Sequence, residues 1–272
     1  MAHVKDLLSV VQKYWELYIG IDDLLAPVII ELNSEYHTSS DSETDTQLKG
    51  RQQTQAFAAV EAVMRHLISR NLKKPSSGIG GFLVSKFFVK KNRILEAAAA
   101  HLCNINPDHQ VLEVGFGPGL GLKEVFNKVS KGSGTVHGID ISQKSFSLAN
   151  KNLKQEIGTG KIKLHLASVT DIPYDSCTFD SIFHCNCYYF WPNMDDAVTE
   201  LHRVIKPDKS MVATLSLPRM KMVQKHGFMQ YGNIDPERYM TSLEKNGFYD
   251  VVMKTIPFED KEIDAIIAKA RK

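Results

Sequence analysis

Strand-like and helix-like segments alternate from residue 82 onward, and this alternation restricts the possible folds more than any other feature of the sequence. Seven apolar runs have the length and composition of strands, at residues 110–115, 135–140, 161–166, 180–185, 211–217, 248–256 and 262–269. Expected helices separate most of them, near residues 83–102, 120–130, 142–155, 193–206 and 236–246. Strands that alternate with helices pair in parallel, with helices on both faces of the sheet. Only the short segment PFEDKE joins the last two strands, so we predict an α/β fold whose seven-stranded, mostly parallel sheet has an antiparallel last strand.

Residues 1–77 do not follow this alternation and are expected to form an N-terminal helical extension. Apolar residues recur at helical spacing in 3–32 and again in 52–70, and the serine-, threonine- and acid-rich stretch between them predicts a polar linker at about 33–50. The main domain then comprises residues 78–272. The extension is a candidate surface for a homodimer or, alternatively, a helical cover docked on the main domain.

Charge and cysteine content exclude several classes of protein. The formal net charge is +2 without a long run of lysine or arginine, so nucleic acid is not indicated as a partner. Four cysteines in 272 residues do not make a disulfide framework, and Cys185 and Cys187 are too close for a usual zinc site, so we expect no metal and a reducing compartment. No segment has the pattern of a signal peptide or a membrane span, which favours a cytoplasmic protein.

The segment 111-VLEVGFGPGLGL-122 carries four glycines directly after the first expected strand, where α/β sheets usually bind their ligands. Glycines at alternate positions indicate positive φ angles or the close approach of a ligand. A dinucleotide fingerprint would need its third glycine at Leu120 or Leu122, and a Walker loop would need a following Gly-Lys-Ser/Thr. Neither motif is present, so we expect a nucleotide-like cofactor of another kind.

The pattern E-x-G-x-G-P-G at residues 113–119 resembles the first motif of class I S-adenosylmethionine-dependent methyltransferases. Residues 166–207 are similar to the stretch of that family that ends in its RVLKPGG motif, and the similarity covers roughly residues 78–270. The segment 186-NCYYFWP-192, together with residues 75–81 and Asn92, resembles the ubiquinone- and menaquinone-biosynthesis group. The resemblance implies a Rossmann-like fold, S-adenosyl-L-methionine as cofactor with S-adenosyl-L-homocysteine as product, and a small-molecule acceptor.

The resemblance also implies a set of cofactor-binding residues: Glu113, Gly115, Gly117, Gly119, Asp140, Ile141, Ser168 and Val169. In this set Glu113 supports the glycine loop, and the Asp140 carboxylate accepts hydrogen bonds from the ribose hydroxyls. Ile141 packs on the adenine face. Relatives often carry an aspartate where this chain has Ser168, so the adenine amino group would meet a weaker acceptor here.

Aromatic residues on both sides of the expected cofactor site predict the acceptor pocket, with lining residues Phe87, Phe88, Tyr188, Tyr189 and Trp191. The alternative for the aromatic residues after the fourth expected strand is that they only pack against the edge of the sheet. The candidate catalytic residues are His184, Asn186 and His226. His184 is either a general base or a strand histidine that is hydrogen-bonded to a neighbouring residue. His226, in the segment after the fifth expected strand, is a second candidate base.

We therefore expect an enzyme that moves a methyl group to O, N or C of a small organic molecule by in-line displacement. A methyltransferase-like regulatory protein that binds the cofactor without catalysis is the alternative. Amino methylation of nucleic acid or protein is less favoured, because the Asn-Pro-Pro-Tyr motif of such enzymes appears here without its prolines after Asn186. Arsenic methylation is also less favoured, because Cys103 and Cys177 show no matching motif.

Overall fold

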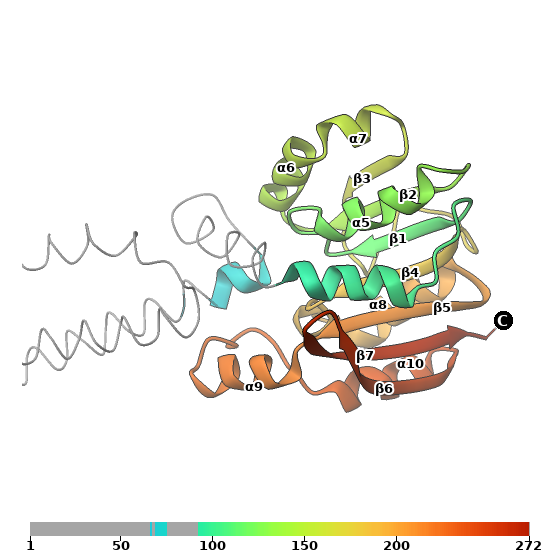
Figure 1. The fold of residues 1–272 in the computed structure, drawn as a ribbon. Helices are drawn as coiled ribbons and strands as arrows, with labels where there is room; N and C mark the ends of the chain where they lie inside the picture. Colours follow the sequence, from blue (N-terminus) through green and yellow to red (C-terminus); the bar gives the residue numbers. More distant parts are fainter. Residues whose placement is uncertain (1–65, 67–68, 75–91, 272) are drawn as a thin grey trace, which may run out of the picture. The chain divides into compact units, whose positions relative to one another are not determined.

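A computed structural model of the chain describes residue 66 and residues 69–74 and 92–271 (Figure 1). The chain divides into two compact units, Met1–His66 and Leu67–Lys272, and the description that follows concerns the second. Almost all of the expected N-terminal extension, its linker, and the candidate acceptor residues Phe87 and Phe88 lie outside the described residues. The predictions made for them stay predictions.

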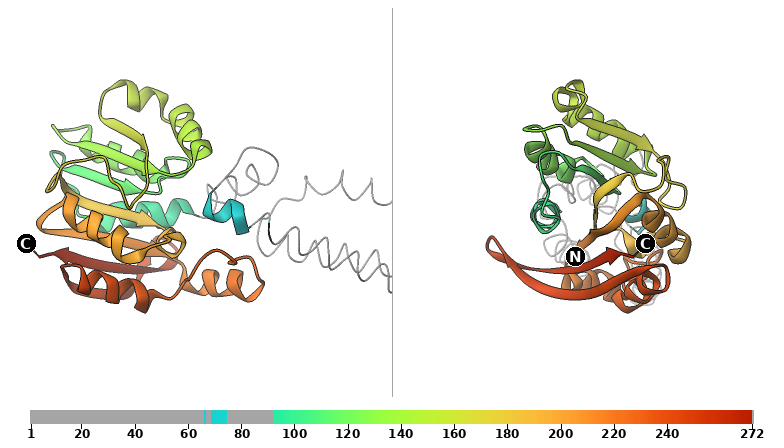
Figure 2. Two further views of the ribbon diagram at one scale, coloured as in Figure 1. Left: turned by 180° about the vertical axis from the view of Figure 1, so that it is seen from behind. Right: turned by 90° about the vertical axis from the view of Figure 1, so that its right-hand side faces the viewer.

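A single seven-stranded sheet forms the centre of this unit, with strand order β3-β2-β1-β4-β5-β7-β6 (Figures 1 and 2). Its strands are β1 (Gln110–Val114), β2 (Thr135–Asp140), β3 (Ile162–Leu166), β4 (Phe179–Cys185), β5 (Ile205–Leu215), β6 (Phe248–Phe258) and β7 (Lys261–Ala270). The first five strands pair in parallel, and β7 runs antiparallel to both β5 and β6. The predicted mostly parallel sheet with an antiparallel last strand is confirmed.

Helices cover both faces of the sheet (Figure 2). They comprise residues 92–102, α5 (Leu120–Val129), α6 (Gln143–Asn152), α7 (Lys154–Gly158), α8 (Met194–Val204), α9 (Leu217–Lys225) and α10 (Pro236–Lys245), with a short 3-10 turn η1 (Tyr188–Phe190). The sequence did not predict α9, because only Met220 and Val223 of this helix are buried and its apolar pattern is correspondingly weak. None of the helices in the described ranges is long and apolar enough to cross a bilayer.

Alternate residues of each strand point to opposite faces of the sheet and build two apolar layers. On one face, Val111, Val136, Phe183 and Val212 pack with residues of 92–102, α5 and α6, and none of the four is exposed. Each such side chain contributes about 1.5–3 kcal/mol by leaving water. This layer fixes the carboxyl ends of β1, β2 and β4 at one edge, next to the helix at 92–102.

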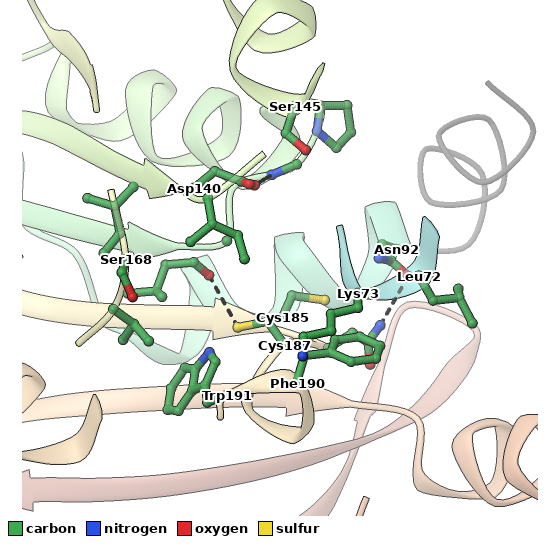
Figure 3. A pocket seen from close by; sticks show the side chains of 18 of the residues that line it. Leu72, Lys73, Asn92, Asp140, Ser145, Ser168, Cys185, Cys187, Phe190 and Trp191 are labelled. Atoms are coloured by element: carbon green, nitrogen blue, oxygen red, sulfur yellow. Dashed lines mark hydrogen bonds between the residues drawn. The ribbon is translucent and has the colours of Figure 1, made fainter. Parts of the chain in front are cut away.

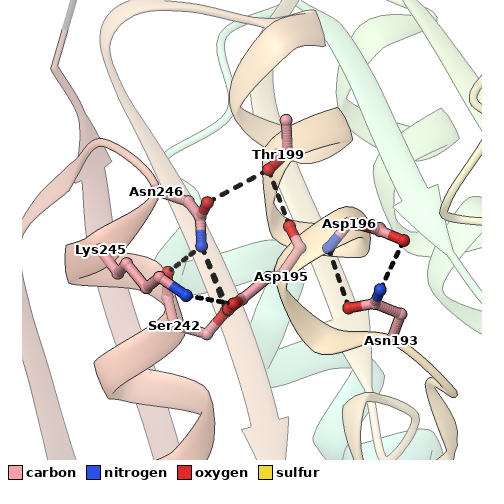
Figure 4. A network of polar contacts seen from close by, with 7 residues as sticks. All are labelled: Asn193, Asp195, Asp196, Thr199, Ser242, Lys245 and Asn246. Atoms are coloured by element: carbon pink, nitrogen blue, oxygen red, sulfur yellow. Dashed lines mark hydrogen bonds and ion pairs between the residues drawn. The ribbon is translucent and has the colours of Figure 1, made fainter.

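A polar network joins α8 to α10 on the other face (Figure 4). The Asp195 carboxylate accepts hydrogen bonds from Ser242 Oγ at 2.6 Å and Asn246 Nδ2 at 3.3 Å, and it pairs with Lys245 Nζ at 2.5 Å. Asn193 caps α8 by accepting the Asp196 N–H at 3.3 Å. The network holds α10 against α8 and thereby keeps Tyr239 of α10 in the core, fully buried.

His137 is a buried polar residue in the middle of β2, 4% exposed. Its Nδ1 lies 2.9 Å from the Tyr174 hydroxyl and its Nε2 lies 2.7 Å from Thr135 Oγ1. Burial, helped by the positive charge of nearby Lys163, lowers the pKa of His137 from 6.5 to about 4. The imidazole is therefore neutral in the folded protein at physiological pH.

Acid should destabilise the fold in part through His137. Because the folded-state pKa is about 4 and the ordinary value 6.5, the unfolded chain binds more protons between these values, and the free energy of unfolding falls as pH drops through that window. The slope for one such histidine reaches about 1.4 kcal/mol per pH unit. Urea unfolding of the wild type and of His137→Gln at pH 7.5 and pH 5 measures this change in the free energy of unfolding. The variant should lose less stability than the wild type between the two pH values, and an equal loss would contradict the assignment.

Candidate functional site

A cavity of about 220 Å³ opens at the carboxyl ends of β1, β2 and β4 (Figure 3). The loops that leave these strands form much of its wall, and β3 adds the segment that follows it. Because parallel strands end at the same edge of the sheet, residues distant in sequence meet here. The residues that the sequence analysis had assigned to the cofactor, acceptor or catalytic site and that line the cavity are Gly115, Gly117, Asp140, Ile141, Ser168, Val169, Asn186 and Trp191.

The glycine loop after β1 has left-handed backbone at Gly115, Gly117 and Gly119, with φ of +74°, +50° and +89°. A Cβ on Gly115 would lie 3.3 Å from Cys187 Cβ, so this glycine lets the loops after β1 and β4 approach each other. Around Gly117 no atom lies within 4 Å of the corresponding position, and this glycine lines the cavity. The loop therefore leaves room for a ligand at Gly117.

Gly119 makes a packing contact in the structure. It does not line the cavity, and a Cβ there would lie 2.6 Å from Leu153 Cδ1. The glycine allows the start of α5 to pack against the end of α6. The open side of the loop is at Gly117, and the assignment of Gly119 to cofactor binding stays a prediction.

Asp140 ends β2 and connects two loops. Its Oδ2 accepts the Gly117 N–H at 3.0 Å, and its Oδ1 accepts the Ser142 N–H at 2.7 Å. The side chain is 9% exposed and lines the cavity. Burial raises the pKa of this carboxyl, and the two backbone hydrogen bonds act in the opposite direction.

The wall beyond Asp140 is apolar apart from two serines, Ser145 and Ser168. Ile141 is 43% exposed, which is unusual for a large aliphatic side chain and leaves its surface available to a ligand. The Ser168 hydroxyl lies 2.8 Å from Thr170 Oγ1 and accepts the Thr170 N–H at 3.2 Å. This local turn holds Ser168 and Val169 at the cavity.

The opposite part of the cavity is lined by Lys73, Asn92, Asn186, Phe190 and Trp191. Asn186 follows β4 with a left-handed backbone, φ +51°, and its Nδ2 donates to Asn92 Oδ1 at 3.1 Å. That bond fixes the orientation of the amide. Asn186 Oδ1 is buried and has no hydrogen-bond partner in the described part of the chain.

Three residues that the sequence analysis placed in the site lie in the core instead. His184 is fully buried with its Nε2 2.8 Å from the Tyr239 hydroxyl, and burial lowers its pKa to about 3. Tyr188 stacks on Tyr239 with ring centroids 4.7 Å apart, and the Tyr189 hydroxyl donates to Met220 Sδ at 3.1 Å. None of them lines the cavity, because His184 faces Tyr239 of α10 and both tyrosines of η1 are buried in the core. This geometry favours the alternatives of a satisfied strand histidine and of aromatic packing.

His226 ends α9, with its Nδ1 2.7 Å from the Met222 carbonyl oxygen, and it is not part of the cavity wall. Glu113 is buried behind the wall. The sequence analysis gave no site role to Lys73 or Glu96, although both line the cavity. Helical spacing was the signal for Glu96, since it lies four positions after Asn92 and both then share one helix face.

Comparison with known proteins identifies the central part of the chain. Residues 111–208 match a family model described as a methyltransferase domain. The uncharacterized methyltransferase YdaC of Bacillus subtilis (strain 168) is 23% identical over 137 residues, which cover 50% of this chain and 70% of that protein. Within residues 111–208 the chain is similar to S-adenosylmethionine-dependent methyltransferases of class I.

A demethylmenaquinone methyltransferase of Lactobacillus johnsonii is 26% identical to this chain over 148 residues, which cover 44% of this chain and 60% of that protein. The segments matched in the curated relatives span between 33% and 70% of those proteins.

Solved structures share the fold at lower identity. A chain in the complex between the Haloferax volcanii Trm112 methyltransferase activator and a methyltransferase has a TM-score of 0.59 and 12% identity, over 70% of this chain and 94% of that one. Phosphoethanolamine N-methyltransferase 2 of Haemonchus contortus, in complex with S-adenosyl-L-methionine, has a TM-score of 0.52 and 14% identity. The match covers 65% of this chain and 52% of that one.

S-adenosylmethionine is the cofactor of the methyltransferase domain, and the cavity residues fit it. Gly117 leaves open the space that a side chain would fill, and the Asp140 carboxylate at the cavity wall is an acceptor for sugar hydroxyls. The exposed face of Ile141 suits a planar base. We propose that Asp140, Ile141 and the Ser168–Val169 turn hold the nucleoside part, with Gly115 and Gly117 beside the amino-acid part.

Gly117→Ala should weaken cofactor binding while the domain stays folded. A side chain at φ +50° costs about 1–2 kcal/mol, and its methyl group would occupy the cavity, so we expect at least about tenfold weaker binding of S-adenosylhomocysteine in calorimetry. Gly119→Ala is the matched control, because its methyl group meets Leu153 rather than the cavity. It should lower the melting temperature more than Gly117→Ala. The reverse order in both measurements would contradict the roles given to the two glycines.

Asp140→Asn should weaken cofactor binding by about tenfold or more, because one carbonyl oxygen replaces two carboxylate acceptors that already hold Gly117 and Ser142. The free energy of unfolding should also fall, since Asp140 is buried and one of the two N–H groups loses its acceptor. Calorimetry with S-adenosylhomocysteine and urea unfolding test both effects. Unchanged affinity would remove Asp140 from the site.

Proposed function

We propose that this protein transfers the methyl group of S-adenosylmethionine to a small organic acceptor by in-line displacement. The bound cofactor supplies an activated sulfonium methyl group, and the protein needs to hold the acceptor about 3 Å away on the line of the leaving sulfur. The observation that carries the proposal is the continuity of the cavity, from the nucleoside-type wall at Asp140 to a second wall at Asn92, Asn186, Phe190 and Trp191.

The second wall has the character of an acceptor pocket. Phe190 and Trp191 present aromatic surface, and Leu72 adds aliphatic surface. Polar groups at this wall are few and fixed, as expected of a small-molecule site. The names of relatives, which include a demethylmenaquinone methyltransferase and an erythromycin 3''-O-methyltransferase, also favour a small organic acceptor.

Asn186 is the residue that we propose to orient the acceptor. Its unpartnered carbonyl oxygen accepts a hydrogen bond, and the Asn92 contact fixes where that oxygen lies. An acceptor with an O–H or N–H group satisfies this oxygen and is aligned by it, whereas a carbon acceptor leaves it unpaired. The proposal therefore favours methylation at oxygen or nitrogen.

The other candidate function is a regulatory protein that binds the cofactor but transfers no methyl group. A metabolite extract incubated with the protein and methyl-labelled S-adenosylmethionine separates the two, combined with calorimetry on S-adenosylhomocysteine. Cofactor binding together with a labelled product supports the enzyme. Binding without any labelled product supports the regulatory protein.

Asn186→Ala should lower kcat/KM for the acceptor found in that screen by about 10- to 100-fold, because the variant cannot align the acceptor hydrogen-bond donor. Affinity for S-adenosylhomocysteine should stay within about twofold of the wild type, since the altered hydrogen bond goes to the acceptor. Steady-state kinetics and calorimetry on the same preparations provide the comparison. Equal losses in both would place Asn186 at the cofactor.

A further inference from the structure

Three polar side chains from separate segments meet at the second wall of the cavity. Asn186 follows β4, Asn92 lies in the helix at 92–102, and Arg219 lies in α9. Asn186 Nδ2 donates to Asn92 Oδ1 at 3.1 Å, and Arg219 Nη2 donates to the same oxygen at 3.2 Å. We call these three residues the amide network. Asn92 lines the cavity (Figure 3), as does Asn186, whereas Arg219 does not.

Arg219 decides which way round both amides lie. The oxygen and the nitrogen of a side-chain amide have nearly the same size, so hydrogen-bond partners determine the position of each. A guanidinium group only donates hydrogen bonds, and it therefore holds the Oδ1 end of Asn92 toward itself. That oxygen also accepts the Asn186 Nδ2 hydrogen, which leaves Asn186 Oδ1 as the atom without a partner in the described part of the chain. With either amide reversed, two donors or two acceptors would face each other.

The charge of Arg219 strengthens its hold on Asn92. Arg219 is half-buried, and burial lowers the pKa of its guanidinium group from the ordinary value. Arginine nevertheless stays protonated in proteins, so a charged donor faces Asn92 Oδ1 at physiological pH. Hydrogen bonds from charged donors are roughly twice as strong as neutral ones. Reversal of the Asn92 amide therefore costs more than the loss of a neutral hydrogen bond.

Other hydrogen bonds hold the backbone around the amide network. The Asn186 N–H donates to the Thr214 carbonyl oxygen at 3.1 Å, and Thr214 Oγ1 donates to the Leu95 carbonyl oxygen at 3.0 Å. These bonds join the loop after β4, strand β5 and the helix at 92–102 without Arg219. Loss of the Arg219 side chain therefore releases the orientation of the amides rather than the position of the chain.

We propose that Arg219 is a positioning residue that acts through Asn92 to turn the carbonyl oxygen of Asn186 toward the methyl acceptor. The proposal rests on the methyl transfer proposed above and extends it to a residue outside the cavity wall. It makes the preference for an acceptor with an O–H or N–H group depend on Arg219. With the amides reversed, Asn186 presents N–H donors, and the hydrogen of the acceptor group loses its partner.

Amide hydrogen exchange in the free protein tests the orientation. In protein labelled only at asparagine nitrogen, the side-chain signals of Asn186 are those missing from Asn186→Ala. The Asn186 Nδ2 hydrogens should exchange with water at least about tenfold faster in Arg219→Met, where the amides can reverse. Arg219→Gln both donates and accepts, so it should behave like Arg219→Met, whereas Arg219→Lys only donates and should exchange as slowly as the wild type. Lys221→Met, at an exposed position of α9, is the control and should leave the rate unchanged.

A double-mutant cycle tests whether Arg219 acts through Asn186. With the acceptor that the screen with methyl-labelled S-adenosylmethionine identifies, Arg219→Met should lower kcat/KM by about tenfold, and Arg219→Lys should restore most of it. Affinity for S-adenosylhomocysteine should stay within about twofold of the wild type in both. In the Asn186→Ala background, Arg219→Met should change kcat/KM by less than about twofold, because the residue through which Arg219 acts is gone.

The outcomes separate this proposal from the proposed function. Equal losses from Arg219→Met with and without Asn186, or equal exchange rates in the wild type and Arg219→Met, would overturn the role of Arg219 while methyl transfer by the wild type stands. Equal kcat/KM values for Arg219→Met and Arg219→Lys would overturn it too, and would leave Arg219 a packing role. If the wild type labels no acceptor, the proposed function fails and the positioning role of Arg219 fails with it.

Discussion

The carboxylate of Asp140 is the interaction on which the architecture of the site depends. One side chain accepts a backbone N–H from the glycine loop after β1 and another from the start of α6, and so fixes two loops that leave neighbouring strands. A buried N–H group without an acceptor costs about 1–3 kcal/mol, so loss of this carboxylate would destabilise the junction of the two loops. The position of the glycine loop in turn determines how near Cys187 comes to Gly115 and how much space opens at Gly117.

The sheet was predictable from sequence because its strands are apolar runs and its helices keep an apolar face. The expected strand 110–115 and the observed β1 (Gln110–Val114) agree to within one residue. The site was predictable where backbone conformation leaves a sequence signal, as at Gly115 and Gly117, or where a residue ends a strand, as Asp140 does. α9 lacked such a signal, since only two of its residues are buried.

Side-chain direction was the limit of the sequence analysis. His184 and Cys185 are neighbours in β4, yet one contacts Tyr239 of α10 and the other lines the cavity beside Glu96. A strand sends adjacent residues to opposite faces, and the sequence does not state which face holds the ligand. The amide network was missed for a related reason, because its three residues meet only when α9 packs against the helix at 92–102. Contacts between elements are fixed by packing, not by the local pattern.

The strand order has a consequence for how the domain is made. β7 is the last strand in sequence, yet it lies between β5 and β6 and provides the neighbour through which β6 joins the sheet. During synthesis β6 leaves the ribosome before the strand that connects it to β5. Until β7 follows, β5 has an open edge on that side, and an open edge is a template for pairing with other chains. The nascent domain therefore keeps an open edge at β5 until β7 has emerged.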